Sequence, residues 1–341
     1  MSAVVFDNVS IVFGDAPETA LPLMDKGMER PEIQTETAQV LGVHDCALEV
    51  EAGEILVLMG LSGSGKSTLL RAVNGLNPVV RGAVHVRRGD EMINVTDANA
   101  KTLREMRLSQ IAMVFQQFGL LPWRTVRENV GLGLELGGMP ASERRTKVDE
   151  QLATVGLSDW ADRKVGDLSG GMQQRVGLAR AFATDAPILL MDEPFSALDP
   201  LIRTRLQDEL LELQERLHRT IIFVSHDLDE AFKIGNRIAI MEGGRIVQCG
   251  TPQEIFSNPA NEYVADFVAH MNPLGVLCAR DVMEPVEGTP DISVGPDTDI
   301  REVMEKVGHS GAPVGIVDEG GTLVGQVSKD RVLAKLLDPR S

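Results

Sequence analysis

The sequence has few cysteines, few aromatic residues and no long apolar run. Its three cysteines, Cys46, Cys249 and Cys278, are far apart and form no CxxC pair. Neither a disulfide framework nor a cysteine-rich metal site is expected, and a reducing cytosol fits. Apolar runs such as residues 188–191 have the length of strands and are far too short to cross a bilayer. The first residues lack the basic and apolar segments of a signal peptide, so any membrane role would depend on partner proteins.

Basic residues are also scarce. The chain has 33 lysines and arginines against 50 acidic residues, a formal net charge of -17, and contains no basic block. This balance weighs against nucleic-acid binding, which needs clustered positive charge. It does not exclude nucleotides, because backbone N–H groups, one lysine and Mg²⁺ can bind their phosphates. The 341 residues, 43% of them hydrophobic, are enough for one large domain and a small one.

Strand-like and helix-like segments alternate through most of the chain. A polar stretch at residues 15–39 favours helix and separates the first strands. The alternation predicts an α/β fold with a largely parallel central sheet, and the unbroken apolar runs predict strands buried on both faces. The predicted strands are 4–8, 11–13, 47–50, 55–59, 111–115, 188–191 and 221–224, and the predicted helices are 67–74, 144–154, 170–183 and 201–217.

A glycine-rich segment, GLSGSGKST at residues 60–68, follows the strand at 55–59 and opens a helix. It matches the phosphate-binding pattern GxxxxGK[ST], and the strand–loop–helix context favours this interpretation over a flexible turn. Its glycines let N–H groups turn inward around an anion, with Lys66 at the β- and γ-phosphates of ATP and Ser67 on Mg²⁺. The candidate binding residues are Gly60, Ser62, Gly63, Ser64, Gly65, Lys66, Ser67 and Thr68.

Two adjacent carboxylates, Asp192 and Glu193, end the apolar run ILLM. Such a pair is weak evidence alone, but downstream of the glycine-rich segment it predicts Asp192 near Mg²⁺ and Glu193 beside the attacking water. Glu193 would then act as the general base or polarise that water.

The segment LSGGMQQR at residues 168–175 identifies a family. Ser169 is expected to cap a helix, and Gly170 and Gly171 would expose N–H groups at its start. An ordinary capped helix would explain these residues in isolation. The segment resembles the LSGGQ signature of ABC ATPases, with Met172 in place of the usual glutamine. The resemblance implies nucleotide contacts by Ser169, Gly170, Gly171 and Gln173.

The resemblance extends to the other family motifs. Gln116 matches the Q-loop glutamine, which senses Mg²⁺ and the transmembrane partner. Asp199 matches the D-loop, which crosses the dimer interface, and His226 matches the switch histidine at the γ-phosphate. Phe13 resembles the aromatic residue that stacks on adenine, although the 15–39 stretch widens its separation from the glycine-rich segment and a core role is equally open.

This family implies a P-loop fold with a RecA-like core, an antiparallel β subdomain and a helical subdomain at about residues 117–183. It also implies a head-to-tail dimer, in which ATP lies between the glycine-rich segment of one chain and the signature of the other. Neither half-site is complete alone. The ATPase domain is expected at residues 1–271.

Further segments, at residues 202–208 and 227–235, resemble the importer ATPases for glycine betaine, proline and choline. Residues 118–124 and 267–273 resemble the choline branch. Such subunits work at the cytoplasmic face of the membrane, on permease subunits, and indirectly with a periplasmic or extracellular substrate-binding protein. The permease surface is expected within residues 118–145, where residues 120–123 form either an apolar docking patch or a buried corner.

The tail, residues 272–341, resembles a single CBS module. Its predicted elements are a helix at 297–307, strands at 313–318 and 323–327, and a helix at 329–337. CBS modules normally work in pairs, so the tail is expected to pair with a second copy, either as a sensor or as a dimer-stabilising appendage.

Other functions stay open at this stage. An importer of another small solute, such as an amino acid or a polyamine, would carry the same motifs. A soluble ABC protein acting on DNA or ribosomes would be expected to show tandem ATPase domains or a basic linker, which this sequence lacks. Binding of ATP without turnover is disfavoured by the intact Lys66, Asp192, Glu193 and His226.

Overall fold

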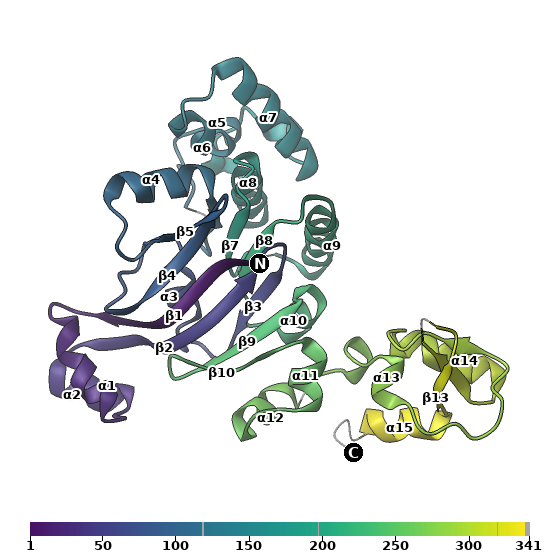
Figure 1. Cartoon of the computed structure of the whole chain (residues 1–341). Helices are drawn as coiled ribbons and strands as arrows, with labels where there is room; N and C mark the ends of the chain where they lie inside the picture. The colour runs from purple at the N-terminus through teal and green to yellow at the C-terminus, as the bar shows by residue number, and fades with distance from the viewer. Residues whose placement is uncertain (118, 197, 270, 319, 338–341) are drawn as a thin grey trace. The chain divides into compact units, whose positions relative to one another are not determined.

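A computed structural model of the chain describes residues 1–117, 119–196, 198–269, 271–318 and 320–337. The chain forms two compact units, one made of residues 1–226 and 239–247 and the other of residues 227–238 and 248–341 (Figure 1). No helix in the described ranges is long and apolar enough to span a membrane. The domain boundary between residues 271 and 272 stays a prediction.

The first unit is built on a six-stranded sheet whose core strands are parallel. β3, β7 and β8 are buried along their whole length, which confirms the prediction from their unbroken apolar runs. Parallel pairing joins β3 to β8, β8 to β7 and β7 to β6, so their carboxyl ends meet at one edge. The strand order is β10 (Arg245–Gly250), β9 (Arg237–Glu242), β3 (Ile55–Met59), β8 (Thr220–Val224), β7 (Ile188–Asp192) and β6 (Ile111–Val114).

A second, antiparallel sheet has the order β2 (Val40–Glu51), β1 (Ser2–Phe13), β4 (Arg81–Arg88) and β5 (Glu91–Asn94). The two short strands predicted at 4–8 and 11–13 are one strand, because Asn8 takes a left-handed conformation (φ 48°) and a register shift there lets pairing with β2 continue. β4 and β5 were not predicted. β4 is rich in arginine, and only Val84 and Val86 in it are buried, while β5 has only four residues.

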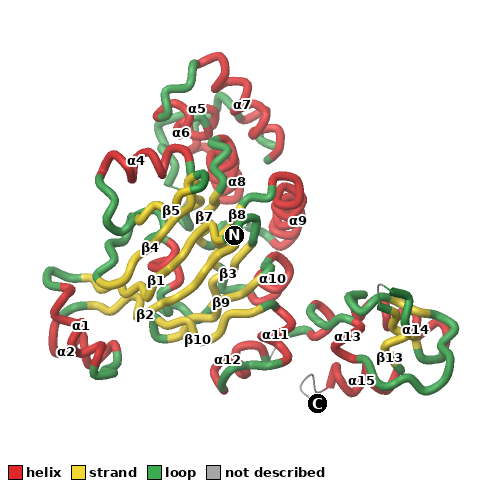
Figure 2. The backbone as a smooth tube through the Cα atoms, viewed as in Figure 1, coloured by secondary structure: helices red, strands yellow, loops and turns green. Residues whose placement is uncertain are grey.

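The helix-favouring stretch between β1 and β2 folds as predicted. It forms a 3₁₀ turn at Pro17–Ala20, α1 (Leu21–Asp25) and α2 (Arg30–Thr37). Ala20, Met24 and Ile33 are buried there against residues of β1 and β2. Phe13, the last residue of β1, pairs with Val40, the first residue of β2. The insert therefore begins and ends at neighbouring, paired residues of β1 and β2 (Figure 2).

Helices α5 to α8 share an apolar core of their own, which includes Val126, Val130, Val148, Leu152 and Val176. Helix α3 ends at Leu70, short of the predicted residue 74, because the chain continues in tighter turns up to Gly75 (φ 65°). Helices α4, α5 and α6 were not predicted; α5 and α6 have five residues each, too few for a clear helical period. The helices of this unit are α3 (Lys66–Leu70), α4 (Ala100–Ser109), α5 (Val126–Val130), α6 (Leu132–Leu136), α7 (Ala141–Thr154), α8 (Gly170–Ala183) and α9 (Pro200–Leu217).

The second unit contains a small three-stranded sheet in the order β11 (Ser293–Val294), β12 (Val314–Val317) and β13 (Leu323–Val327). The predicted hairpin of the tail is present, since β12 and β13 pair antiparallel, while the two-residue β11 and the four-residue α13 were missed. Its helices are α10 (Leu228–Ile234), α11 (Pro252–Ser257), α12 (Glu262–Val268), α13 (Ala279–Val282), α14 (Ile300–Ser310) and α15 (Lys329–Leu337).

Candidate nucleotide-binding site

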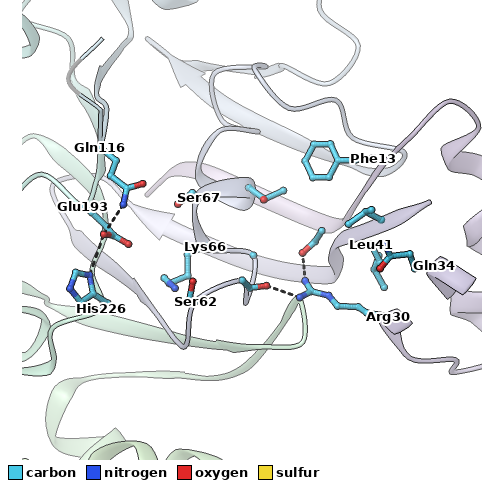
Figure 3. Close-up of a pocket in the computed structure, with 15 residues that line it drawn as sticks. Phe13, Arg30, Gln34, Leu41, Ser62, Lys66, Ser67, Gln116, Glu193 and His226 are labelled. Carbon is cyan, nitrogen blue, oxygen red and sulfur yellow. Dashed lines mark hydrogen bonds and ion pairs between the residues drawn. The ribbon is translucent and has the colours of Figure 1, made fainter. Parts of the chain in front are cut away.

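A cavity of about 720 Å³ lies in the first unit and is lined by the glycine-rich segment. Figure 3 shows Gln116, Glu193 and His226 at one end of it and Phe13 and Arg30 at the other. The lining thus combines the ends of β6, β7 and β8 with residues from β1, β2 and α2. Its members are Phe13, Arg30, Gln34, Val40, Leu41, Gly42, Ser62, Gly63, Gly65, Lys66, Ser67, Thr68, Gln116, Glu193 and His226.

The glycine-rich segment connects β3 to α3, the context that the sequence predicted. Gly60, Gly63 and Gly65 all have positive φ, of 138°, 78° and 106°. A Cβ atom on Gly60 would collide with the carbonyl oxygen of Met241, and one on Gly65 would lie 2.7 Å from the carbonyl oxygen of Gly42. Glycine is therefore required at both positions by backbone conformation and by close approach.

Lys66 is buried at the floor of the cavity. Its Nζ donates hydrogen bonds to the carbonyl oxygens of Gly60 at 2.8 Å and Leu61 at 2.9 Å, and Ser64 Oγ is 3.5 Å away. Burial lowers the pKa of the Lys66 ammonium, while Glu193 and Asp192 act in the opposite sense. Gly60 and Ser64 are outside the cavity lining and contribute by supporting this ammonium.

Asp192, the last residue of β7, is fully buried. One carboxylate oxygen accepts a hydrogen bond from Ser67 Oγ at 2.6 Å, and the other accepts one from the guanidinium of Arg71 at 2.8 Å. Arg71 follows α3 and was not predicted from the sequence. Three oxygen donors of the kind that Mg²⁺ prefers are available here: the hydroxyl of Ser67, the carboxylate of Asp192 and the amide oxygen of Gln116. This donor set fits Mg²⁺.

Glu193 brings three strand ends together. Its Oε2 accepts a hydrogen bond from Gln116 Nε2 at 3.0 Å and lies 3.2 Å from His226 Nδ1. Its backbone is left-handed (φ 47°), and its N–H donates to the carbonyl of Val224 at the end of β8. Holding a non-glycine residue in this conformation costs of the order of 1 kcal/mol of stability. Such strained residues cluster at active sites. The three predicted residues thus converge on one carboxylate.

Phe13 lines the opposite end of the cavity and is 37% exposed. Its ring is beside Gly42, where an added Cβ would lie 2.8 Å from Phe13 Cε2 and 3.1 Å from Thr68 Cγ2. The pairing of Phe13 with Val40 removes the separation that the sequence suggested, because the insert adds chain length without moving β1 from β2. An exposed ring at the cavity wall has the geometry for stacking on a base.

The signature residues are outside this cavity in the same chain. Ser169 caps α8 by accepting a hydrogen bond from the N–H of Met172 at 3.4 Å, and Gln173 donates to the carbonyl of Leu168. Asp199 caps α9, accepting from the N–H of Ile202 at 3.1 Å. These residues, with Gly170 and Gly171, are absent from the cavity lining, so one chain holds only part of the predicted site.

The sequence missed Arg30 and Gln34. They are one helical turn apart on α2 and both line the cavity. No motif marks them, and the only signal in the sequence was that their segment follows Phe13.

In the region predicted to receive a permease, only some of the apolar side chains are exposed. Leu120 packs against the core of α5 to α8, whereas Trp123 is 68% exposed, and Phe118 is outside the described residues. A second cavity of about 300 Å³ opens beside it, lined by Phe115, Leu132, Leu136 and Arg180 among others.

Together, the sheet order, the glycine-rich segment and the convergent carboxylate define a nucleotide-binding protein of the P-loop class. A family model described as ABC transporter matches residues 43–196, and one described as CBS domain matches residues 279–338.

Two curated proteins and one solved structure illustrate what the chain is similar to. It is 46% identical over 334 residues to the glycine betaine/proline betaine transport system ATP-binding protein of Salmonella typhimurium, covering 96% of this chain and 81% of that protein. It is 40% identical over 227 residues to the choline transport ATP-binding protein of Bacillus subtilis, covering 66% and 58% respectively. The dimeric structure of a post-hydrolysis state of an ATP-binding cassette bound to ADP and Pi matches with a TM-score of 0.62 and 31% identity, covering 73% of this chain and 98% of that one.

The chain belongs to the family of ABC transporter ATP-binding subunits of the glycine betaine/proline/choline import systems, and it is an ATPase that carries a CBS domain.

Proposed function

We propose that this ATPase drives import of a quaternary ammonium compatible solute, such as glycine betaine, proline betaine or choline. The observation that carries the proposal is the 46% identity to a glycine betaine/proline betaine system protein over 96% of this chain, tail included. Uptake of labelled glycine betaine and labelled choline in a strain lacking this gene, with and without the gene restored, tests it. Loss and restoration of either uptake supports the proposal. Unchanged uptake of both, with loss of amino-acid or polyamine uptake, would replace it.

The proposed reaction is attack of water on the γ-phosphorus of ATP. A new P–O bond forms to the water oxygen, the bond from the γ-phosphorus to the β–γ bridging oxygen breaks, and ADP and phosphate leave. Glu193 accepts or polarises the water proton, while Gln116 and His226 hold its carboxylate in place. Lys66 compensates phosphate charge. Ser67, Asp192 and Gln116 would hold Mg²⁺, which when bound neutralises charge on the β- and γ-phosphate oxygens.

The complete site is proposed to need two copies of the chain. The signature and D-loop residues do not line the cavity of their own chain. If they contact a nucleotide, it has to be the nucleotide bound by a second copy. These residues are Ser169, Gly170, Gly171, Gln173 and Asp199. The dimeric ATP-binding cassette that this chain resembles has the same class of fold. A head-to-tail pair would place these residues over the glycine-rich segment of the partner.

The membrane association is proposed to come from permease subunits at the cytoplasmic face, with the cavity beside Phe115 and Arg180 and the exposed Trp123 as the docking surface. A substrate-binding protein would then act through the permease and not on this chain.

The CBS domain is proposed to pair with its copy in the second chain, because a single small module buries little surface alone. Deleting the residues after 271 tests this pairing: an unchanged dimer with unchanged regulation of transport would refute it.

A further inference from the structure

The insert between β1 and β2 contributes an arginine to the nucleotide cavity. Arg30 is at the start of α2, and its guanidinium reaches across to the glycine-rich segment (Figure 3). Nη1 donates to the carbonyl oxygen of Gly63 at 2.7 Å, and Nη2 donates to the carbonyl oxygen of Gly42. One side chain therefore joins the glycine-rich segment to β2, the strand that pairs with Phe13.

The two acceptors have defined roles in the cavity wall. An anion-binding loop turns its N–H groups inward, which leaves its carbonyl groups to find partners outside. Arg30 provides that outer partner for Gly63. Gly42 is a point of close approach between β2 and the glycine-rich segment, since a Cβ on Gly65 would lie 2.7 Å from the Gly42 oxygen. A Cβ on Gly244 would collide with the same guanidinium, so the turn between β9 and β10 also closes around it.

The charge of Arg30 has no carboxylate partner among the described residues. Its hydrogen bonds go only to neutral carbonyl groups, and burial lowers the pKa of its guanidinium. An arginine stays protonated under these conditions. A fixed positive charge that is half-buried and uncompensated is favourable beside a polyphosphate, whose negative charge it offsets in a medium of reduced dielectric.

We propose that Arg30 is a positioning residue of the nucleotide site: it holds the glycine-rich segment in its anion-binding conformation and adds a fixed positive charge beside the phosphates. This inference rests on the nucleotide site proposed above. It also gives the α1–α2 insert a role in ATP affinity, whereas the machinery of hydrolysis around Glu193 is at the other end of the cavity.

The test uses the full chain and four variants. Arg30→Met keeps much of the apolar stem but removes the charge and both hydrogen bonds, and Arg30→Lys keeps the charge and can bond one carbonyl. Lys26→Ala removes a charge from an exposed residue of the same insert and is the matched control. Lys66→Ala reports on the proposed site itself. MgADP affinity is measured by calorimetry, and KM and kcat for ATP by phosphate release.

Arg30→Met should weaken MgADP binding and raise KM about tenfold, which corresponds to about 1.4 kcal/mol, with kcat at saturating ATP within about twofold. Arg30→Lys should give an intermediate affinity, and Lys26→Ala should match the natural chain. Equal affinity for Arg30→Met and the natural chain overturns the proposal, as does an equal loss in Arg30→Lys and Arg30→Met. If Lys66→Ala also binds normally, the nucleotide site itself is wrong. A loss in Lys66→Ala alone refutes only the role of Arg30.

Discussion

Replacing Glu193 by glutamine separates the chemistry of hydrolysis from the binding of ATP. Glutamine has nearly the same volume, and its amide oxygen can still accept the 3.0 Å hydrogen bond from Gln116 Nε2. The variant can also keep the backbone bond from residue 193 to the carbonyl of Val224. The cavity should therefore keep its shape, while the group that accepts the water proton is lost.

The expected size of the effect follows from the role of a positioned base. General acid–base catalysis contributes about 10²- to 10⁴-fold to a rate, or about 3–5 kcal/mol of barrier. Glu193→Gln should lower phosphate release by that factor. Affinity for MgATP should stay the same or increase, since a negative charge near the γ-phosphate is removed.

Single-turnover release of phosphate measures the chemical step, and gel filtration with MgATP measures the accumulation of an ATP-bound dimer. Glu150→Gln, an exposed change on α7 outside the cavity, is the matched control and should behave like the natural chain. Hydrolysis by Glu193→Gln at the normal rate would refute the assigned role. A joint loss of hydrolysis and ATP binding would show instead that Glu193 supports the cavity.

Two further predictions concern stability. Gly60→Ala should lower the free energy of unfolding by at least about 3 kcal/mol, because the added Cβ would collide with the Met241 carbonyl at a backbone φ of 138°. Gly63→Ala should lower it by about 1 kcal/mol, because a Cβ added there meets no atom within 4 Å. Urea denaturation of both variants checks this, and equal losses would contradict it. Burial raises the pKa of the Cys46 thiol from 9.0 to about 11, so the stability linked to this thiol is complete below pH 9 and is lost as the pH rises towards 11. The fall in unfolding free energy between pH 9 and 11 should be smaller in Cys46→Ala by at most about 3 kcal/mol, and parallel pH curves for the two proteins would contradict the assignment.

The core of the ATPase unit could be predicted because its signals are local. Residues 188–191 are uniformly apolar, and such a short run is typical of a strand buried on both faces. The segment at residues 60–68 combines required glycines with a lysine at fixed spacing. Parallel strands then bring Gln116, Glu193 and His226 to one edge of the sheet, so their convergence followed from the topology.

What the sequence did not reveal depends on contacts between distant segments. Arg30 is held at the cavity wall by hydrogen bonds to Gly42 and Gly63, which are twelve and thirty-three residues away in the sequence. No local sequence pattern encodes these contacts. The four-residue strand at Glu91–Asn94 is too short for a clear sequence signal, and it pairs antiparallel with Arg81–Arg88. The stretch at residues 15–39 separates Phe13 from the glycine-rich segment along the chain, and the pairing of Phe13 with Val40 cancels that length.

The position of Ser169 outside its own cavity has a consequence for inheritance. A cell with two defective gene copies, one coding Lys66→Ala and the other Ser169→Arg, would assemble about half of its pairs from one chain of each kind. In the head-to-tail pair proposed above, each mixed pair would have one nucleotide pocket with both lesions and one pocket with none. The two alleles should therefore complement each other, and partial uptake should return in a cell that has no normal copy of the gene.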